Sequence, residues 1–162
     1  MKNLILVRHA KSSWETPIQD VDRPLSKKGV HAAHVVSSYI SKYLPKSYLF
    51  WSSVAERASQ TALIFAQNLS YPIESIVYVE DLYTFDEDQL THVIKSCKND
   101  FDNVILFGHN GAITDFVNKF GDVLINNVPT SGFVSLQFDV EDWNSIKKGK
   151  TLHFITPKDL KQ

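Results

Sequence analysis

The sequence lacks the features that would place it in an oxidising or membrane environment. It contains one cysteine, Cys97, which cannot form a disulfide within the chain. The apolar run near its N-terminus is too short to span a membrane. Its first residues lack the charged, apolar and small-residue order of a signal peptide. We therefore expect a soluble protein in a reducing, cytoplasmic compartment.

Excess charge of either sign is also missing. The 17 lysines and arginines nearly balance the 18 aspartates and glutamates, which gives a formal net charge of −1. This balance argues against a general nucleic-acid binder or a polybasic membrane-surface protein, so we expect neither nucleic acid nor membrane as a partner. Any basic site must be concentrated in one place.

Repeats, linkers and low-complexity tracts are absent, and 162 residues with 43% hydrophobic content suffice for one domain over residues 1–162. Apolar patterns predict strands over 4–7, 48–51, 76–79, 104–107, 133–138 and 152–155. Helical spacing predicts helices over 27–44, 55–69 and 113–120, and a shorter one that begins near the acidic residues 86–88 and runs to 97, with Ser52 or Ser53 as the N-cap of the second helix. This alternation predicts an α/β three-layer sandwich: a mainly parallel central sheet, helices on both faces and an antiparallel edge at the C-terminus.

Cationic and imidazole side chains follow three of the expected strands. Arg8 and His9 end the first strand, Arg57 lies within one helical turn of the second, and His109 follows the strand over 104–107. The carboxyl ends of parallel strands open onto one edge of a sheet, so these four side chains are expected to converge. Helix N-termini beside such a pocket also favour anions, because their backbone N–H groups are free. The pocket therefore suits a phosphoryl group.

Such a pocket has the parts that phosphoryl transfer needs. Two guanidinium groups can neutralise phosphoryl oxygens bidentately without a metal ion, so no metal or other cofactor is expected. A histidine flanked by cations is held neutral and can act as a nucleophile. A second histidine, if protonated when a dianion binds, can stabilise the transferring charge.

Three segments carry a resemblance to a known family. Segments 7–10 (Val-Arg-His-Ala), 52–62 and 104–110 resemble, in order and spacing, the signature segments of the histidine phosphatase superfamily, which includes phosphoglycerate mutases. The resemblance implies that His9 is the nucleophile and forms a phosphohistidine. It also implies that Arg8, Arg57 and His109 hold the phosphoryl group.

Two further segments, 8–14 and 22–29, are similar to the small SixA-type phosphohistidine phosphatases. This similarity adds Arg23 as a substrate-facing cation and implies phosphohistidine on signalling or phosphotransfer proteins as the substrate. Ala10 departs from the superfamily, where glycine is usual, although the SixA-like branch tolerates alanine. Superfamily members that act on alkyl phosphates use a carboxylic acid after the third strand, where Glu80 or Asp81 stands here.

Structural interpretations compete with some of these roles. Arg57 could pair with Glu56 or Asp81 on the protein surface, and Arg23 could pair with Asp20 or Asp22. His31 and His34, one helical turn apart, could suggest a metal site, but no other ligand accompanies them, so surface histidines are the favoured interpretation.

Three functions remain open at this point. The first is a metal-independent phosphatase that acts on phosphohistidine-bearing proteins. The second is a phosphatase for a small phosphorylated substrate, which would use Glu80 as the acid and a pocket wall around Trp14 and Tyr83. The third is a non-catalytic module that binds phosphorylated partners, although such a module has no need of a nucleophile. The sequence does not define the oligomeric state.

Overall fold

A six-stranded sheet forms the centre of the protein in a computed structural model that describes residues 1–161. Its strands lie in the order β3-β2-β4-β1-β5-β6. All neighbouring pairs are parallel except those of β5, which runs antiparallel to both β1 and β6. The strands are β1 (Lys2–Arg8), β2 (Leu49–Ser53), β3 (Val77–Val79), β4 (Asn103–Gly108), β5 (Phe133–Phe138) and β6 (Lys150–Ile155). The mainly parallel sheet with antiparallel pairing at its C-terminal side is thereby confirmed.

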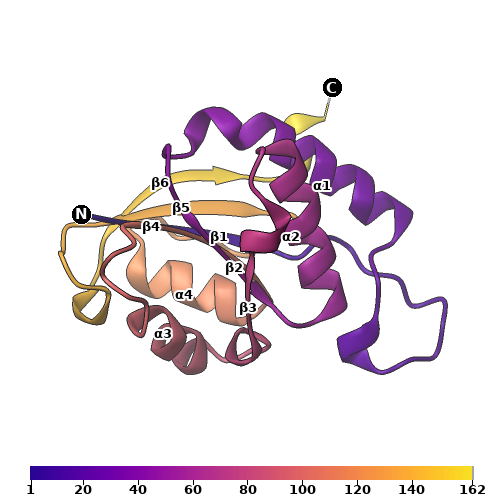
Figure 1. The fold of residues 1–162 in the computed structure, drawn as a ribbon, viewed down its shortest axis with the longest axis horizontal. Helices are drawn as coiled ribbons and strands as arrows, with labels where there is room; N and C mark the ends of the chain where they lie inside the picture. The colour runs from indigo at the N-terminus through magenta and orange to yellow at the C-terminus, as the bar shows by residue number, and fades with distance from the viewer. Residues whose placement is uncertain (162) are drawn as a thin grey trace.

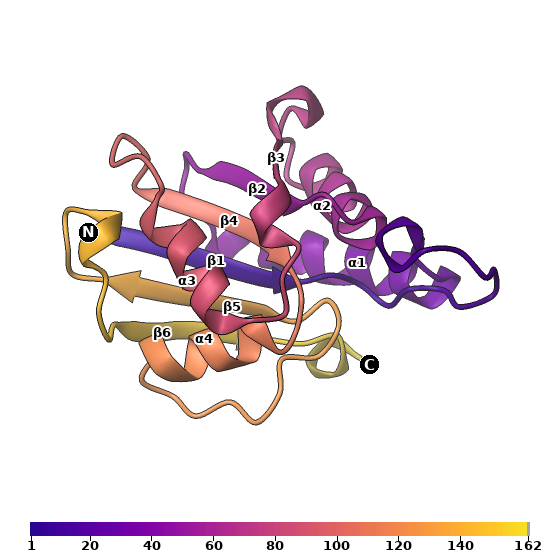
Figure 2. The same ribbon diagram turned by 90° about the horizontal axis from the view of Figure 1, so that it is seen from below.

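Helices cover both faces of this sheet (Figures 1 and 2). Helices α1 and α2 pack on one face, and α3 and α4 on the other, so the expected three layers are present. The helices are α1 (Lys27–Ile40), α2 (Glu56–Asn68), α3 (Glu87–Lys95) and α4 (Ala112–Phe120). Among residues 1–161, no helix is both long and apolar enough to cross a membrane.

Strand β1 shows how the sequence produces these layers. Its central residues 4–7 are all buried, because alternate side chains of a strand point to opposite faces and both faces are covered. Leu4 and Leu6 join the apolar cluster beneath α3 and α4, whereas Ile5 and Val7 join the cluster beneath α1 and α2. The unbroken apolar run is thus the signature of a strand with a core on each side.

The topology places the ends of β1 and β4 side by side. The chain leaves β1 toward the face of α1 and leaves β4 toward the face of α4, and in open α/β sheets ligands bind where neighbouring strands diverge in this way. Arg8 is in register with Gly108, and the backbone N–H of His9 donates to the Gly108 carbonyl at 3.0 Å. Segments 100 residues apart in sequence therefore meet at one edge of the sheet.

The loop over residues 11–25 extends beyond this edge and is fastened to the start of α1 (Figure 2). Ser26 caps the helix by accepting from the N–H of Gly29 at 3.0 Å, and its hydroxyl donates to the Lys11 carbonyl at 3.1 Å. A Cβ on Gly29 would lie 2.1 Å from the Lys11 oxygen. Only glycine permits this approach, which fixes the backbone directly after Ala10.

Two predicted boundaries were wrong. Ser52 and Ser53 do not cap α2; they belong to β2, because β2 continues to pair with β3 as far as Ser53 opposite Val79, and Ala55 is the N-cap. The first helix ends at Ile40 and continues only as a 3-10 turn, Ser41–Tyr43. In both cases the boundary is set by backbone hydrogen bonding, which the pattern of apolar side chains does not reveal.

Candidate active site

A cleft of about 350 Å³ opens at the carboxyl ends of β1 and β2. It lies at the divergence of β1 and β4, as expected for an open α/β sheet. The residues that line it are Arg8, His9, Lys11, Ser12, Trp14, Asp20, Arg23, Arg57, Phe85, Asn110 and Thr130. Five of these eleven carry a basic side chain and only Asp20 carries a carboxylate, so the concentrated basic site that the charge balance required is here.

The hydrogen bonds of His9 define which of its ring nitrogens is free. Its Nδ1 lies 2.6 Å from the carbonyl oxygen of Ala10, which can only accept, so Nδ1 carries the proton. Nε2 therefore has a lone pair, and it accepts from Nε of Arg57 at 3.3 Å. Burial lowers the pKa of His9 to about 4, and the charges of Arg57 and Arg8 lower it too. The ring is neutral at neutral pH, chiefly through burial and only secondarily through the flanking cations.

His109 lies beside His9, with their ring centroids 5.2 Å apart. Its Nε2 is 2.8 Å from the hydroxyl of Ser53, which already accepts from the N–H of Ala55 at 3.2 Å. The serine hydrogen is then best used toward Nε2, which leaves the proton of His109 on Nδ1. Burial, followed by the neighbouring His9, lowers the pKa of His109 to about 3. His109 is thus a neutral ring with its proton on Nδ1, and its protonation on binding of a dianion stays a prediction.

Arg57 and Arg23 are joined through a residue that the sequence interpretation did not place in the site. Asp20 accepts from Nη2 of Arg57 at 3.0 Å and from Nε of Arg23 at 3.1 Å. It also accepts from the hydroxyl of Tyr83. The Tyr83 hydrogen bond, followed by those of Arg57, lowers the pKa of Asp20 to about 2. Asp20 is therefore an ionised carboxylate between the two guanidinium groups.

Arg23 is additionally held against Trp14. Its guanidinium carbon lies 3.4 Å from the ring centroid of Trp14, and its side chain is buried although that of Trp14 is 76% exposed. The indole thus forms an outer wall of the cleft.

Unpaired buried polar atoms gather at the same edge. Within residues 1–161 the buried side-chain atoms without a hydrogen-bond partner are Nε of Arg8, Nδ1 of His109 and Oγ of Ser131. Ser131 has φ 60°, and its N–H donates to the carbonyls of Arg8 and His9 at 3.0 and 3.2 Å. Since buried donors are normally paired, these atoms mark a place suited to an anionic ligand.

Ala10 and Thr61 connect the end of β1 to α2. The side chain of Ala10 is fully buried in the core, so its methyl group fills core space instead of crowding the cleft. The N–H of Ala10 donates to the hydroxyl of Thr61 at 2.9 Å, and that hydroxyl donates to the Arg57 carbonyl at 2.7 Å. Thr61 therefore sets the position of Arg57 relative to His9.

The structure brings together Arg8, His9, Arg57 and His109, with Arg23 on the rim. It does not bring Glu80 to them: Glu80 is exposed on the 3-10 turn Glu80–Leu82 and does not line the cleft.

The alternative partners proposed for Arg57 were wrong, since its carboxylate partner is Asp20 and not Glu56 or Asp81. For Arg23 the pairing with Asp20 was foreseen. Asp20, Ser53 and Thr61 were missed as parts of the site, because each acts through a tertiary contact. Ser53 and Thr61 lie within segment 52–62, which carries the family resemblance, whereas Asp20 lies in the loop between two motif segments.

His31 and His34 both lie exposed on α1, and Nδ1 of His34 contacts the Asn68 amide nitrogen at 3.0 Å. Across the described residues 1–161, no group of three or more histidine, cysteine, aspartate or glutamate side chains is placed to hold a metal ion.

Both the sequence and the fold of this chain are similar to those of known proteins. Residues 4–86, about half of the chain, match the model of the histidine phosphatase superfamily (branch 1). The chain belongs to the histidine phosphatase superfamily. An uncharacterised chloroplast protein of Arabidopsis thaliana is 32% identical over 120 residues, which are 67% of this chain and 54% of that protein. The chain thus matches about half the length of this relative.

Solved structures of superfamily members share the fold. The protein histidine phosphatase SixA in complex with tungstate superposes with a TM-score of 0.82 at 18% identity, over 98% of this chain and 99% of that one. A putative phosphohistidine phosphatase SixA from Agrobacterium tumefaciens gives 0.78 at 26% identity, over 96% and 99%. A mycobacterial glucosyl-3-phosphoglycerate phosphatase gives 0.67 at 14% identity, over 93% and 97%. The expected kinship with SixA-type members is confirmed.

Proposed function

We propose that this histidine phosphatase removes phosphoryl groups from phosphohistidine on proteins through a phosphohistidine intermediate on His9. Superfamily membership supports phosphatase activity. The observation that carries the intermediate is the state of His9: a neutral ring with Nδ1 bonded to Ala10 and the lone pair of Nε2 turned to the guanidinium of Arg57. The nucleophilic nitrogen of His9 thus lies next to Arg57, the cation that would bind the phosphoryl group under attack.

In the first step, Nε2 of His9 attacks phosphorus in line with the substrate nitrogen, and the bond from phosphorus to that nitrogen breaks. The substrate imidazole keeps the electron pair and leaves neutral, because its other nitrogen already carries a proton. The phosphorylated ring of His9 becomes cationic, and its Nδ1–H remains bonded to the Ala10 carbonyl. This hydrogen bond to the charged ring stabilises the intermediate.

Charge on the transferring phosphoryl group requires donors from several sides. Among residues 1–161, Nε of Arg8 and Nδ1 of His109 are two of the three buried side-chain atoms without a hydrogen-bond partner, and Arg57 adds its guanidinium from α2. In the second step, water attacks phosphorus, the bond to Nε2 breaks and returns its electron pair to a neutral His9, and the product leaves as dihydrogen phosphate, which keeps both protons of the water. The same donors hold the phosphoryl oxygens in both steps.

The cleft offers no evident proton donor for an alkoxide leaving group. Asp20 is the one carboxylate among the lining residues, and its low pKa and its arginine partners keep it ionised. Glu80 lies outside the cleft. A protonated imidazole can leave without general-acid assistance, whereas an alkoxide needs a proton, so these features favour phosphohistidine over phosphate monoesters.

Turnover on two matched substrate sets tests this proposal. One set contains phosphohistidine and histidine-phosphorylated proteins, and the other contains small phosphomonoesters, each assayed with wild type and with Glu80→Gln. We expect release of phosphate from the phosphohistidine set at the same rate in both proteins. Activity confined to esters and lost in Glu80→Gln would establish the small-substrate phosphatase instead, and no turnover on either set would favour a binding module.

A further inference from the structure

A second and larger hollow, of about 710 Å³, adjoins the cleft. It runs between α1 and the C-terminal 3-10 turn Lys158–Leu160, and we call it the α1 groove. It shares Lys11 and Thr130 with the cleft, so the two hollows lie next to each other. The residues that line it are Lys11, Lys27, Lys28, His31, Ala32, Val35, Thr130, Pro157, Leu160 and Lys161.

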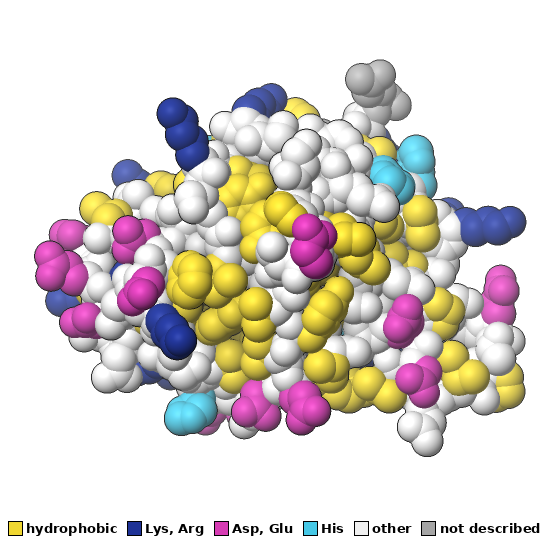
Figure 3. Space-filling model, viewed as in Figure 1, with side chains coloured by type: hydrophobic (Ala, Val, Ile, Leu, Met, Phe, Trp, Pro, Cys, Tyr) yellow, Lys and Arg dark blue, Asp and Glu magenta, His cyan; other side chains and the backbone are white. Residues whose placement is uncertain are grey.

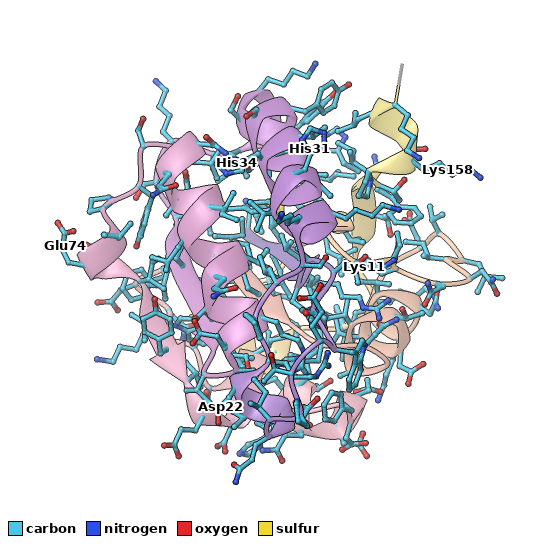
Figure 4. All side chains as sticks on the ribbon, turned by 90° about the vertical axis from the view of Figure 1, so that its right-hand side faces the viewer. Lys11, Asp22, His31, His34, Glu74 and Lys158 are labelled. Atoms are coloured by element: carbon cyan, nitrogen blue, oxygen red, sulfur yellow. The ribbon has the colours of Figure 1, made fainter. Side chains whose placement is uncertain are left out.

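The rim of the α1 groove is basic. Four of its ten lining residues are lysines, one is His31 and none, within the described residues, carries a carboxylate. Figure 4 faces this end of the molecule: His31 lies on α1 with Lys11 below it, and Lys158 stands on the C-terminal turn to the right. The labelled acidic residues Asp22 and Glu74 lie toward the bottom and the left of the view. Asp159 does not line the α1 groove. It lines a neighbouring hollow between α1 and the C-terminal turn, and its carboxylate accepts from the N–H of Thr156.

The lysines around the α1 groove form a local basic strip, whereas the protein as a whole is nearly neutral. The net charge is −1, and carboxylates are spread over the left, lower and right parts of the face in Figure 3. A basic strip on a nearly neutral protein indicates electrostatic recognition of an acidic partner.

The floor of the α1 groove is apolar. It is formed by Ala32 and Val35 on α1 and by Pro157 and Leu160 from the C-terminal turn. Lys27 and Lys28 stand at the start of α1, and Lys161 stands on the other wall, so the cations surround the floor instead of converging on one point as the cleft arginines do. A free phosphate would make no use of such a floor. A polypeptide segment with both apolar and acidic side chains would use all of it.

We propose that the α1 groove docks an acidic, partly apolar segment of the protein whose phosphohistidine enters the cleft. The proposal rests on the proposed function, because the cleft must receive the phosphohistidine of the same partner. Because the two hollows adjoin at Lys11 and Thr130, one partner chain can reach from the groove to the cleft, and charge complementarity sets the sign of the docked segment. The groove then selects among phosphohistidine proteins that the cleft alone treats alike.

The test uses two histidine-phosphorylated peptides of equal length, one with glutamate and leucine flanks and one with lysine in place of glutamate. Free phosphohistidine is the third substrate. The variant is Lys27→Glu with Lys28→Glu, two exposed positions that do not line the cleft. The matched control is Lys147→Glu with Lys148→Glu, exposed lysines of the β5–β6 connection at the opposite end of the sheet.

For the glutamate peptide we expect the groove variant to raise KM by roughly tenfold, the equivalent of losing a few surface ion pairs, with kcat unchanged. KM for free phosphohistidine stays at the wild-type value, and the control variant matches wild type on all substrates. Added salt reduces the preference of wild type for the glutamate peptide. An unchanged KM for the glutamate peptide in the groove variant would overturn the docking proposal.

Failure of the proposed function would look different. Wild type would then release phosphate from none of the three substrates. Docking is tested separately by fluorescence anisotropy of the unphosphorylated glutamate peptide: weaker binding to the groove variant than to wild type and control supports docking, and equal binding to all three contradicts it. Thermal unfolding by circular dichroism confirms that each variant is folded.

Discussion

Asp20 forms ion pairs with both Arg57 and Arg23 in the cleft. Its carboxylate accepts from Arg57 and Arg23 and so occupies N–H groups that phosphoryl oxygens would otherwise use. A bound phosphoryl dianion and the Asp20 carboxylate also repel each other. Asp20 therefore keeps the arginines in place while weakening the cleft's attraction for anions.

The substitution Asp20→Asn is expected to tighten inhibition by inorganic phosphate, lowering its Ki several-fold, on the order of 1 kcal/mol of binding free energy. The amide keeps the shape of the side chain but removes its charge. Steady-state inhibition by phosphate measures the effect, with Glu15→Gln in the same exposed loop as the control. A higher Ki in Asp20→Asn would mean that orienting Arg57 outweighs the repulsion.

Ser53 acts on catalysis only through His109. Loss of its hydroxyl in Ser53→Ala removes the partner of Nε2, and His109 can then place its proton on either nitrogen. We expect kcat to fall by about tenfold, the usual size of one buried hydrogen bond, with a small change in KM. Ser53→Thr retains a hydroxyl and should restore most of the rate; failure of threonine to do so, or an unchanged kcat in the alanine variant, would argue against the tautomer assignment.

At the scale of elements, the start of α1 and the end of β1 form one unit. Gly29 lets the helix approach the Lys11 carbonyl, two residues beyond His9. A methyl group there must push the backbone of residues 10–12 away from the sheet edge.

The substitution Gly29→Ala is therefore expected to lower the free energy of unfolding by about 1–3 kcal/mol, as overpacking does elsewhere, and to reduce kcat as well. Urea unfolding and steady-state kinetics measure the two effects. Val30→Ala, at a partly exposed neighbouring position of α1, is the control. Wild-type stability and activity in Gly29→Ala would show that the loop adapts without cost.

Sequence patterns predicted these elements well where burial is regular. Continuous apolar runs identified β1 and β4, and their side-by-side pairing follows from the topology. The loop over residues 11–25 has no period, so Asp20 could be foreseen as a partner of Arg23 three residues away but not of Arg57 on α2. The prediction for Ser53 was wrong for a related reason. A serine before a helix usually caps it, but this one belongs to β2, which pairs with β3, and its hydroxyl contacts His109.

For the molecule as a whole, the two buried histidines link stability to pH. The pKa of His9 is about 4 and that of His109 about 3 in the folded protein, whereas both are near 6.5 in an unfolded chain. Below pH 6.5 the unfolded chain takes up protons that the folded protein does not, so stability falls as pH falls. Above pH 6.5 both states hold neutral rings and the effect vanishes.

Urea unfolding should accordingly show a loss on the order of 4 kcal/mol between pH 7 and pH 5, about 2 kcal/mol from each histidine. Asp20, with a pKa of about 2, stays ionised throughout this range and does not contribute. The double variant His9→Asn with His109→Asn should have a clearly flatter profile. An equally steep profile in that variant would assign the pH dependence to other groups.

The central claim is that His9 carries the phosphoryl group during turnover. Brief incubation with a substrate labelled with radioactive phosphorus, followed by denaturation in alkali, should leave the label on wild type as an acid-labile, alkali-stable adduct. His9→Asn should retain none of the label, while Glu80→Gln should retain as much as wild type. Equal labelling of wild type and His9→Asn would contradict a phosphohistidine on His9, because the phosphoryl group would then rest on another residue.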